Sequence, residues 1–393
     1  MIGEAVSMTG TWMQVMAQNW VMTTLTSSAM MLGWVTFAAG VPMIALTMIG
    51  GSFADRYDRR RILLLTQLVQ IVFALALGWL VATERVQIWH VIGIAFLLGI
   101  SNSFEMPSAA ALVPELVPRQ HVATAIAIDR SIFHGTRLIG PALAGYVVGL
   151  WGTASAFYLN AFSFLAMILA LFTLHPRPQG SAEEEAQRRS GMKEGLAYVR
   201  SDRPTMGMIA LMAATTVFVF PVMVVMLPLY ARNVLLLGAD KMGLLMGLSG
   251  IGSFTASISL LAVPRHKRSG FMLLAVTAAT VALVCLSRAH RFSVAAGSLI
   301  LLSLGVSTLI GLANTIVQER APSPLRGRVS AVAGLSFFGL MPLASLGMTS
   351  VADWLGLRTT LLVSAALYLS TAIPVLVATR LRPSSEATQT GRV

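Results

Sequence analysis

The sequence has 393 residues, of which 56% are hydrophobic and 11% are charged, and its mean hydropathy is +0.76. Soluble domains carry about 25% charged residues, so this composition excludes an ordinary water-soluble enzyme. A net charge of +12 could indicate nucleic-acid binding, but such binding surfaces interleave basic and aromatic residues, and the sequence has no stripe of this kind. The remaining class is a polytopic membrane protein without a nucleic-acid partner.

Apolar runs separated by charges, glycines and prolines predict twelve transmembrane helices, because each span needs about 20 apolar residues. We expect them at residues 3–26, 29–53, 62–83, 87–105, 122–150, 153–174, 204–232, 240–263, 270–287, 292–316, 327–352 and 357–379. A polar segment divides them six and six, and its residues 192–199 predict a short amphipathic helix on the membrane surface. The predicted fold is all-α, with an N-terminal bundle (1–174), a cytoplasmic linker (175–203), a C-terminal bundle (204–380) and a cytoplasmic tail (381–393).

Lysine and arginine are distributed unevenly over the predicted connections. If both termini are cytoplasmic, 20 of the 28 Lys and Arg residues fall in cytoplasmic segments and six fall outside. Such an excess marks the cytoplasmic side. We therefore expect a multi-pass protein of the plasma or inner membrane with both termini inside the cell.

A weak internal repeat relates the two halves. Val113-Pro-Glu-Leu-Val-Pro118 resembles Val317-Gln-Glu-Arg-Ala-Pro322 at an offset of 204, and Gly152 falls opposite Gly356 at the same offset. An offset that spans an even number of crossings makes the halves parallel repeats, an arrangement found in alternating-access transporters.

Several motifs resemble those of the major facilitator superfamily. The segment Gly51-Ser-Phe-Ala-Asp-Arg-Tyr-Asp-Arg-Arg-Arg61 resembles its G-x-x-x-D-R-x-x-R-R loop, and Gly140-Pro-Ala-Leu-Ala-Gly145 resembles the G-P-x-x-G-G segment of its drug:proton antiporters. Residues 10–14, 104–107, 113–119, 137–145 and 325–329 resemble the branch that contains the enterobactin exporter and macrolide-efflux-like proteins. The resemblance implies the major facilitator fold, with two six-helix bundles.

In that superfamily the loop after the second helix is a cytoplasmic gate. We expect Gly51 to permit close helix approach, and we expect Arg59 to pair with Glu105 at the inner end of the fourth span. The alternative is that the arginines only set the topology. The candidate gate residues are Gly51, Asp55, Arg56, Arg59, Arg60 and Glu105.

Polar residues interrupt the fifth span along a narrow face. At 100° per residue, Arg130, His134 and Arg137 project within about 60° of one another, deep in the hydrocarbon layer. Intramembrane charges usually face a water-filled path or a partner. We expect Asp129, Arg130, His134 and Arg137 to line a central cavity where substrate or a proton binds. The alternative is an internal network with Glu4 or Glu105.

Two further features lie in the first and fifth spans. Gln14 and Gln18 share one face of the first span and are candidate substrate contacts, with interhelical hydrogen bonding as the alternative. Gly140, Pro141 and Gly145 predict a hinge in the fifth span, because proline removes a backbone donor. Gly243 and Gly247 form a small-residue packing signal that we expect inside the molecule.

The sequence predicts a secondary exporter of a small amphipathic compound, drug-like or siderophore-like, that works by alternating access with protons. The six histidines lack metal-ligand spacing, and neither H-E-x-x-H, G-x-S-x-G nor a Walker A motif occurs. We therefore expect no enzyme, metal or cofactor, and a monomer in the lipid bilayer. The alternatives are an importer, a lipid or metabolite transporter, or a non-transporting truncated paralogue.

Overall fold

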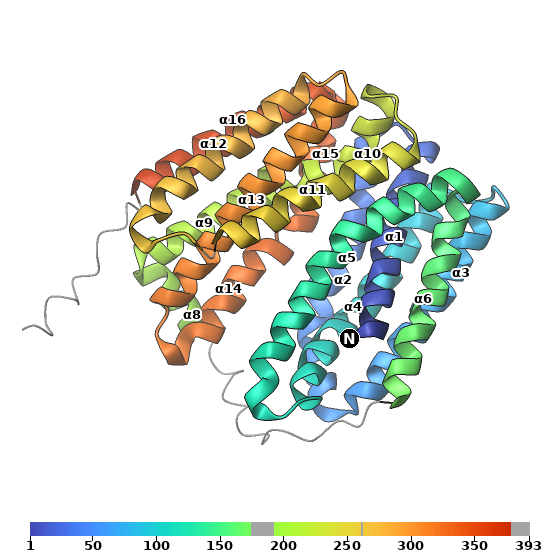
Figure 1. Ribbon diagram of the computed structural model, residues 1–393, viewed down its shortest axis with the longest axis horizontal. Coiled ribbons are helices and arrows are strands. Elements are labelled where there is room, and N and C mark those ends of the chain that lie inside the picture. The colour runs from blue at the N-terminus through green and yellow to red at the C-terminus, as the bar shows by residue number, and fades with distance from the viewer. Residues whose placement is uncertain (174–191, 261, 379–393) are drawn as a thin grey trace, which may run out of the picture.

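The computed structural model describes residues 1–173, 192–260 and 262–378, and its regular structure within those ranges is helical. The first half forms one bundle of long helices (Figure 1). These are α1 (Ile2–Leu25), α2 (Ala29–Arg56), α3 (Arg59–Ala82), α4 (Ile88–Glu115), α5 (Val122–Trp151) and α6 (Thr153–Thr173).

The second half begins with the short helix α8 (Met192–Ser201), which confirms the helix predicted at residues 192–199. The preceding part of the predicted linker lies outside the described residues. The second bundle then contains α9 (Arg203–Phe218), α10 (Leu227–Leu229), α11 (Ala239–Leu260), α12 (Arg268–Ser287), α13 (Phe292–Arg320), α14 (Arg326–Phe338), α15 (Met341–Leu355) and α16 (Leu357–Ala378).

The twelve predicted spans are all present as helices. Ten stretches are long and apolar enough to cross a membrane, counting residues Arg203–Val234 and Ser323–Leu355 as one span each. The other two are α1 and α5, which are long enough but more polar, and they pack along α6 and α11 inside the assembly.

The fourth helix is longer than predicted, because it continues past Pro107 and Pro114 to Glu115. A proline inside a helix leaves the carbonyl four residues earlier without its donor. For Pro107 that carbonyl is Ser103, and Gly50 of α2 packs directly against it, so close that a side chain at Gly50 would collide. The proline therefore marks a close helix contact instead of a helix end.

One stretch of the second bundle, Arg203–Val234, is interrupted at two prolines. After α9, residues Val222–Met226 and Tyr230–Val234 form π-helical turns around Pro221 and Pro228. Ser364 of α16 donates to the Phe218 carbonyl at this break. Such side-chain donors make broken helices tolerable in a membrane.

The connections define two ends of the molecule. We call the end with the α2–α3, α4–α5, α11–α12 and α13–α14 connections the basic end, and the opposite one the far end. The repeat is visible at the far end, where Gly152 and Gly356 end α5 and α15 with φ of 79° and 83°. Positive φ favours glycine, so the same residue type closes the same helix in each half.

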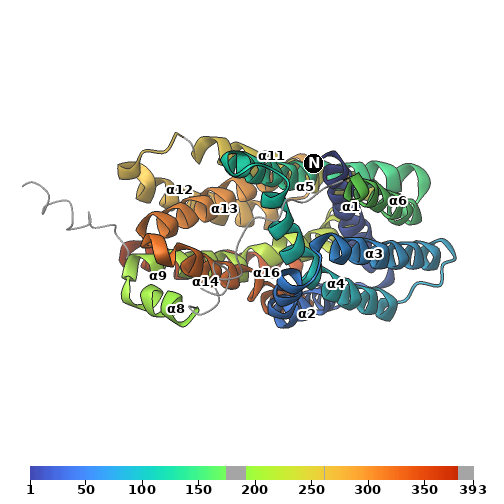
Figure 2. The same ribbon diagram turned by 90° about the horizontal axis from the view of Figure 1, so that it is seen from below.

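The bundles meet along two seams, α5 with α11 and α2 with α15. Figure 2 shows α5 and α11 together on one side of the molecule and α2 on the other. The helices of the two bundles converge toward the far end and spread toward the end that carries α8 and α14 (Figure 1).

Candidate functional site

The seam between α2 and α15 is held by one carboxylate at the far end. Asp353 of α15 accepts hydrogen bonds from the backbone amides of Ala29 (2.5 Å) and Met30 (3.2 Å) and from the Ser28 hydroxyl. These donors form the start of α2, where a helix has unpaired amides and a partial positive charge. Asp353 thus caps a helix of the opposite bundle.

The seam between α5 and α11 is made of small residues. A side chain at Gly145 would lie 2.9 Å from the carbonyl oxygens of Ala239 and Asp240, and one at Gly243 would lie 2.5 Å from the Pro141 carbonyl. Gly247 likewise packs against Ala142. The expectation that Gly243 and Gly247 pack inside the molecule is confirmed.

The predicted hinge residues therefore lie in contacts with two different helices. Pro141 and Gly145 face α11, whereas a side chain at Gly140 would meet Trp12 of α1 at 2.5 Å. The helix runs through Pro141 from Val122 to Trp151 without interruption. Bending at this point during transport stays a prediction.

At the basic end, Arg59 pairs with Glu115 and not with Glu105, so the expected partner was wrong. Its guanidinium also donates to the carbonyls of Ala54 (3.0 Å) and Ala111 (3.2 Å). The reason is the greater length of α4, whose end lies three turns beyond Glu105. Gly51 also differs from expectation, because a side chain there would meet nothing within 4 Å. The close approach belongs to Gly50.

A hollow of about 240 Å³ lies between the α2–α3 connection and α4. Asp55, Arg59 and Glu115 contribute to its lining. Arg60 does more than set topology, because it donates to the Phe172 carbonyl of α6 (3.0 Å) and stacks on the Phe172 ring. Arg56, by contrast, is exposed at the end of α2.

The second bundle repeats this arrangement. Glu319, which is 204 residues after Glu115, accepts two hydrogen bonds from Arg268 (2.7 and 3.1 Å) and lies 3.5 Å from Arg265. Each bundle therefore ties an arginine of its α2–α3 or α11–α12 connection to a glutamate that ends the fourth helix of that bundle. The internal repeat seen in the sequence is confirmed by these equivalent ion pairs.

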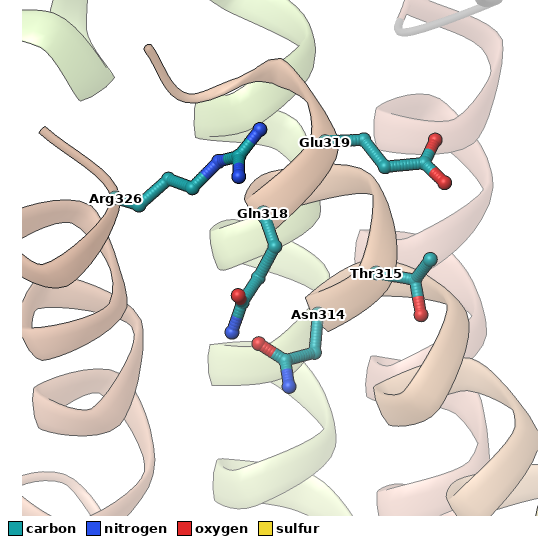
Figure 3. A pocket seen from close by; sticks show the side chains of 5 residues that line it. All are labelled: Asn314, Thr315, Gln318, Glu319 and Arg326. Carbon is teal, nitrogen blue, oxygen red and sulfur yellow. The ribbon is translucent and has the colours of Figure 1, made fainter. Parts of the chain in front are cut away.

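A second hollow, of about 330 Å³, opens beside Glu319 at the end of α13. Figure 3 shows Asn314 and Gln318 pointing to the same side, Thr315 and Glu319 pointing to the other, and Arg326 reaching across from α14. Amide groups and a guanidinium can bind a polar or anionic group. The sequence analysis missed this site, although Asn314 and Gln318 are a polar pair four residues apart in an apolar span.

The helix α8 is tied to the second bundle by polar contacts. Glu194 pairs with Arg328, and the Tyr198 hydroxyl donates to the Arg320 carbonyl (2.7 Å). The adjoining Asp202 accepts two hydrogen bonds from Arg320 (2.8 and 2.7 Å) and caps α9 through the Thr205 amide. The Arg320 hydrogen bonds, with those from Thr205, lower the pKa of Asp202 to about 2.

The polar face of α5 meets α1. The carboxyl groups of Asp129 and Glu4 lie close to each other, and the Arg137 guanidinium lies over the Trp12 ring, 5.6 Å from its centre. These contacts correspond to the internal network considered above, with Glu4 as a member. The side chains of Arg130 and His134 lie outside the described residues.

The two glutamines of α1 lie inside the first bundle. Gln14 is 6% exposed and accepts a hydrogen bond from Asn160 of α6 (2.7 Å), and Gln18 is 8% exposed. Gln14 therefore makes the interhelical bond that was the alternative to substrate contact.

The sequence matches the profile of the transmembrane secretion effector family over residues 1–392. The chain belongs to this family of major facilitator transporters. It is accordingly a multi-pass membrane protein and not an enzyme.

Three relatives are named for transport. The chain is 24% identical to the multidrug efflux pump Tap of Mycolicibacterium fortuitum (90% of this chain, 88% of Tap) and 23% identical to macrolide efflux protein A of Streptococcus pyogenes (94% and 93%). It is 26% identical to the staphyloferrin A transporter of Staphylococcus aureus over 64% of this chain, and that match spans 63% of the transporter.

Solved structures show the same fold. A bacterial homologue of the human lysosomal transporter Spinster, in an inward-facing and occupied conformation, aligns with a TM-score of 0.72 at 14% identity over 96% of each chain. A D-xylose-proton symporter aligns with a TM-score of 0.71 at 12% identity, over 95% of this chain and 97% of the symporter. The major facilitator fold predicted from the motifs is confirmed.

Proposed function

We propose that the protein exports a small amphipathic organic compound by alternating access, driven by the proton gradient. The observation that carries the proposal is the pair of seams that join two repeated bundles at the far end while the bundles spread at the basic end. A transporter that alternates must be able to open and close each end in turn. The names of two relatives support outward transport of drugs.

The basic end is assigned to the cytoplasm, because lysine and arginine mark cytoplasmic connections. In this orientation the conformation is closed toward the outside. The ion pairs of Glu115 and Glu319 lie beside the cytoplasmic opening, and Asp55, Arg56 and Arg59 are assigned to the gate that closes it in the opposite conformation.

The substrate is assigned an apolar body and a polar or anionic group. The hollow lined by Asn314, Gln318 and Arg326 offers hydrogen-bond donors and a guanidinium at the cytoplasmic side, where an exported compound first meets the protein. Its position supports a role in binding the polar group before the conformational change.

The test is efflux from cells that express the chain, with a panel of ethidium, erythromycin and an iron-free siderophore, each with and without a protonophore. Loss of efflux on adding the protonophore, for at least one compound, would support a proton-driven exporter. Accumulation in place of efflux would reverse the proposed direction. Efflux that persists without a proton gradient would contradict proton coupling.

A further inference from the structure

A carboxyl group lies inside the first bundle between two amide side chains. Glu105 of α4 accepts hydrogen bonds from the side-chain amide nitrogens of Gln67 (2.8 Å to Oε1) and Gln70 of α3. These glutamines are 1% and 5% exposed. Each carboxylate oxygen therefore has its own neutral donor.

The cluster lies several turns inside the basic ends of its two helices, a position that suits a site within the membrane. Gln67 lies eight residues from the start of α3 at Arg59, and Glu105 lies ten residues from the end of α4 at Glu115. At 1.5 Å per residue these positions are about 12 and about 15 Å from the basic end of their helices, in a hydrocarbon layer of about 30 Å. Ionisable side chains at such depth are rare and usually functional.

The cluster is connected to α1 by a further hydrogen bond. The Ser7 hydroxyl donates to Oε1 of Gln67 (3.5 Å), while the nitrogen of the same amide donates to Glu105. The Gln67 amide is thus oriented by both neighbours. Ser7, Gln67 and Glu105 form a polar chain from α1 through α3 to α4.

Charged groups on the packed helices have other contacts. Arg59 pairs with Glu115, Arg60 donates to the Phe172 carbonyl, and Arg61 lies 3.7 Å from Asp58. The carboxyl groups of Glu4 and Asp129 lie close to each other, and Arg137 lies over Trp12. Asp55 and Arg56 lie at the exposed end of α2, and His90 lies at the start of α4. Among the side chains that the structure describes, no cation forms an ion pair with Glu105, and its carboxylate is hydrogen-bonded by the two amides.

We propose that Glu105 is the residue that binds and releases the coupling proton. An ionised carboxyl without a cation is costly in a membrane, and binding a proton removes this cost. In the binding step one O–H bond forms at a carboxylate oxygen and one breaks in the hydronium ion that delivers the proton. The amides suit both states, since a side-chain amide can donate to a carboxylate and accept from a carboxylic acid. This assignment rests on the proposed function.

The first test needs no transport substrate. Dicyclohexylcarbodiimide adds to protonated carboxyl groups in apolar surroundings, and mass spectrometry of peptides from the purified protein locates the adduct. We expect labelling at Glu105 that falls at least about tenfold between about pH 5 and about pH 9. Absence of labelling at Glu105, or labelling that does not change with pH, would overturn the assignment.

Gln70→Leu separates proton binding from a purely structural role. Loss of one amide donor destabilises the carboxylate relative to the acid, so labelling of Glu105 should persist to higher pH, by about one unit. Thr66→Val, on the same helix, is the control and should leave the profile unchanged. An unchanged profile in Gln70→Leu would contradict the role of the amide in proton binding.

Glu105→Gln completes the test in liposomes with ethidium as the probe. The variant should lose uphill ethidium transport driven by a pH gradient but keep ethidium exchange at equal pH, and Glu105→Asp should recover part of the uphill transport. Uphill transport in Glu105→Gln would overturn the assignment of the proton to Glu105. Absence of ethidium movement in the wild type would count against the proposed function and leave the labelling result to decide the role of Glu105.

Discussion

Single ion pairs hold the segment before α9 to the second bundle. Asp202 is bound by Arg320 through two hydrogen bonds, and its pKa is lowered to about 2. A carboxyl whose pKa is lower in the folded state stabilises the fold above its unfolded pKa of about 3.9. That contribution is lost as the pH falls through the folded value. The stabilisation that Asp202 contributes should therefore be constant near neutral pH and fall only in acid.

We expect the thermal midpoint of the purified protein to fall between about pH 4 and about pH 2 more steeply in the wild type than in Asp202→Asn. The variant should already melt lower at pH 7, because the charge-assisted bonds to Arg320 are gone. Circular dichroism melts in detergent measure both effects. Equal acid sensitivity of the two proteins would show that Asp202 does not carry this pH dependence.

Arg326 tests the binding role of the hollow beside α13. Arg326→Ala removes its guanidinium and should raise the apparent KM for the exported compound about tenfold, with little change in maximal rate, because binding before the conformational change is lost. Arg200→Ala, an exposed arginine of α8, is the control. A lower maximal rate at unchanged KM would show that Arg326 acts in the conformational change.

Residue contacts were predictable where the sequence repeats and unpredictable where partners are distant. The offset of 204 relates Glu115 to Glu319, and the structure gives both an arginine partner. The partner of Arg59 was misplaced by three turns, because Pro107 suggests a helix end unless the contact with Gly50 is known. Local sequence does not contain that contact.

At the scale of elements, the two seams use different physics. The α2–α15 seam depends on a charge that caps a helix, whereas the α5–α11 seam depends on the absence of side chains. The sequence predicted that Gly243 and Gly247 pack inside the molecule, since small residues at intervals of four indicate close helix packing. It did not indicate Asp353, whose partner Ser28 is 325 residues away in the chain.

Two glycines one turn apart in α5 provide a matched test of the glycine seam. Gly145→Ala places a methyl group 2.9 Å from two carbonyl oxygens of α11, while Gly149→Ala places one at an ordinary 3.4 Å from Asp240. Gly145→Ala should reduce transport severalfold because the far end no longer closes, and Gly149→Ala should be near normal. Equal transport by the two variants, at equal abundance in the membrane, would show that the seam adapts.

At the scale of the whole molecule, two repeated bundles meet along two seams. In the proposed transport cycle, one conformation is closed at the far end and the other is closed at the basic end. Over the two seams together, each bundle contributes one helix start and one helix end: α2 and α5 from the first bundle, α11 and α15 from the second. In the proposed transport cycle, opening the far end would break the bonds from Asp353 to the start of α2. The strength of the Asp353 hydrogen bonds should therefore set part of the free-energy difference between these two conformations. Weakening the bonds should change the distance between the two bundles at the basic end.

Asp353→Asn removes the capping charge but keeps a side chain that can accept hydrogen bonds. A charged cap contributes about 1 kcal/mol, and we expect about a fivefold shift toward the conformation that is closed at the basic end.

Spin labels at Gln120→Cys and Ser323→Cys, with Cys285→Ala, report the distance across that end. Glu84→Gln, which removes an exposed charge at the far end, is the control. The same distance distribution in Asp353→Asn and Glu84→Gln would mean that the cap does not bias the transport cycle.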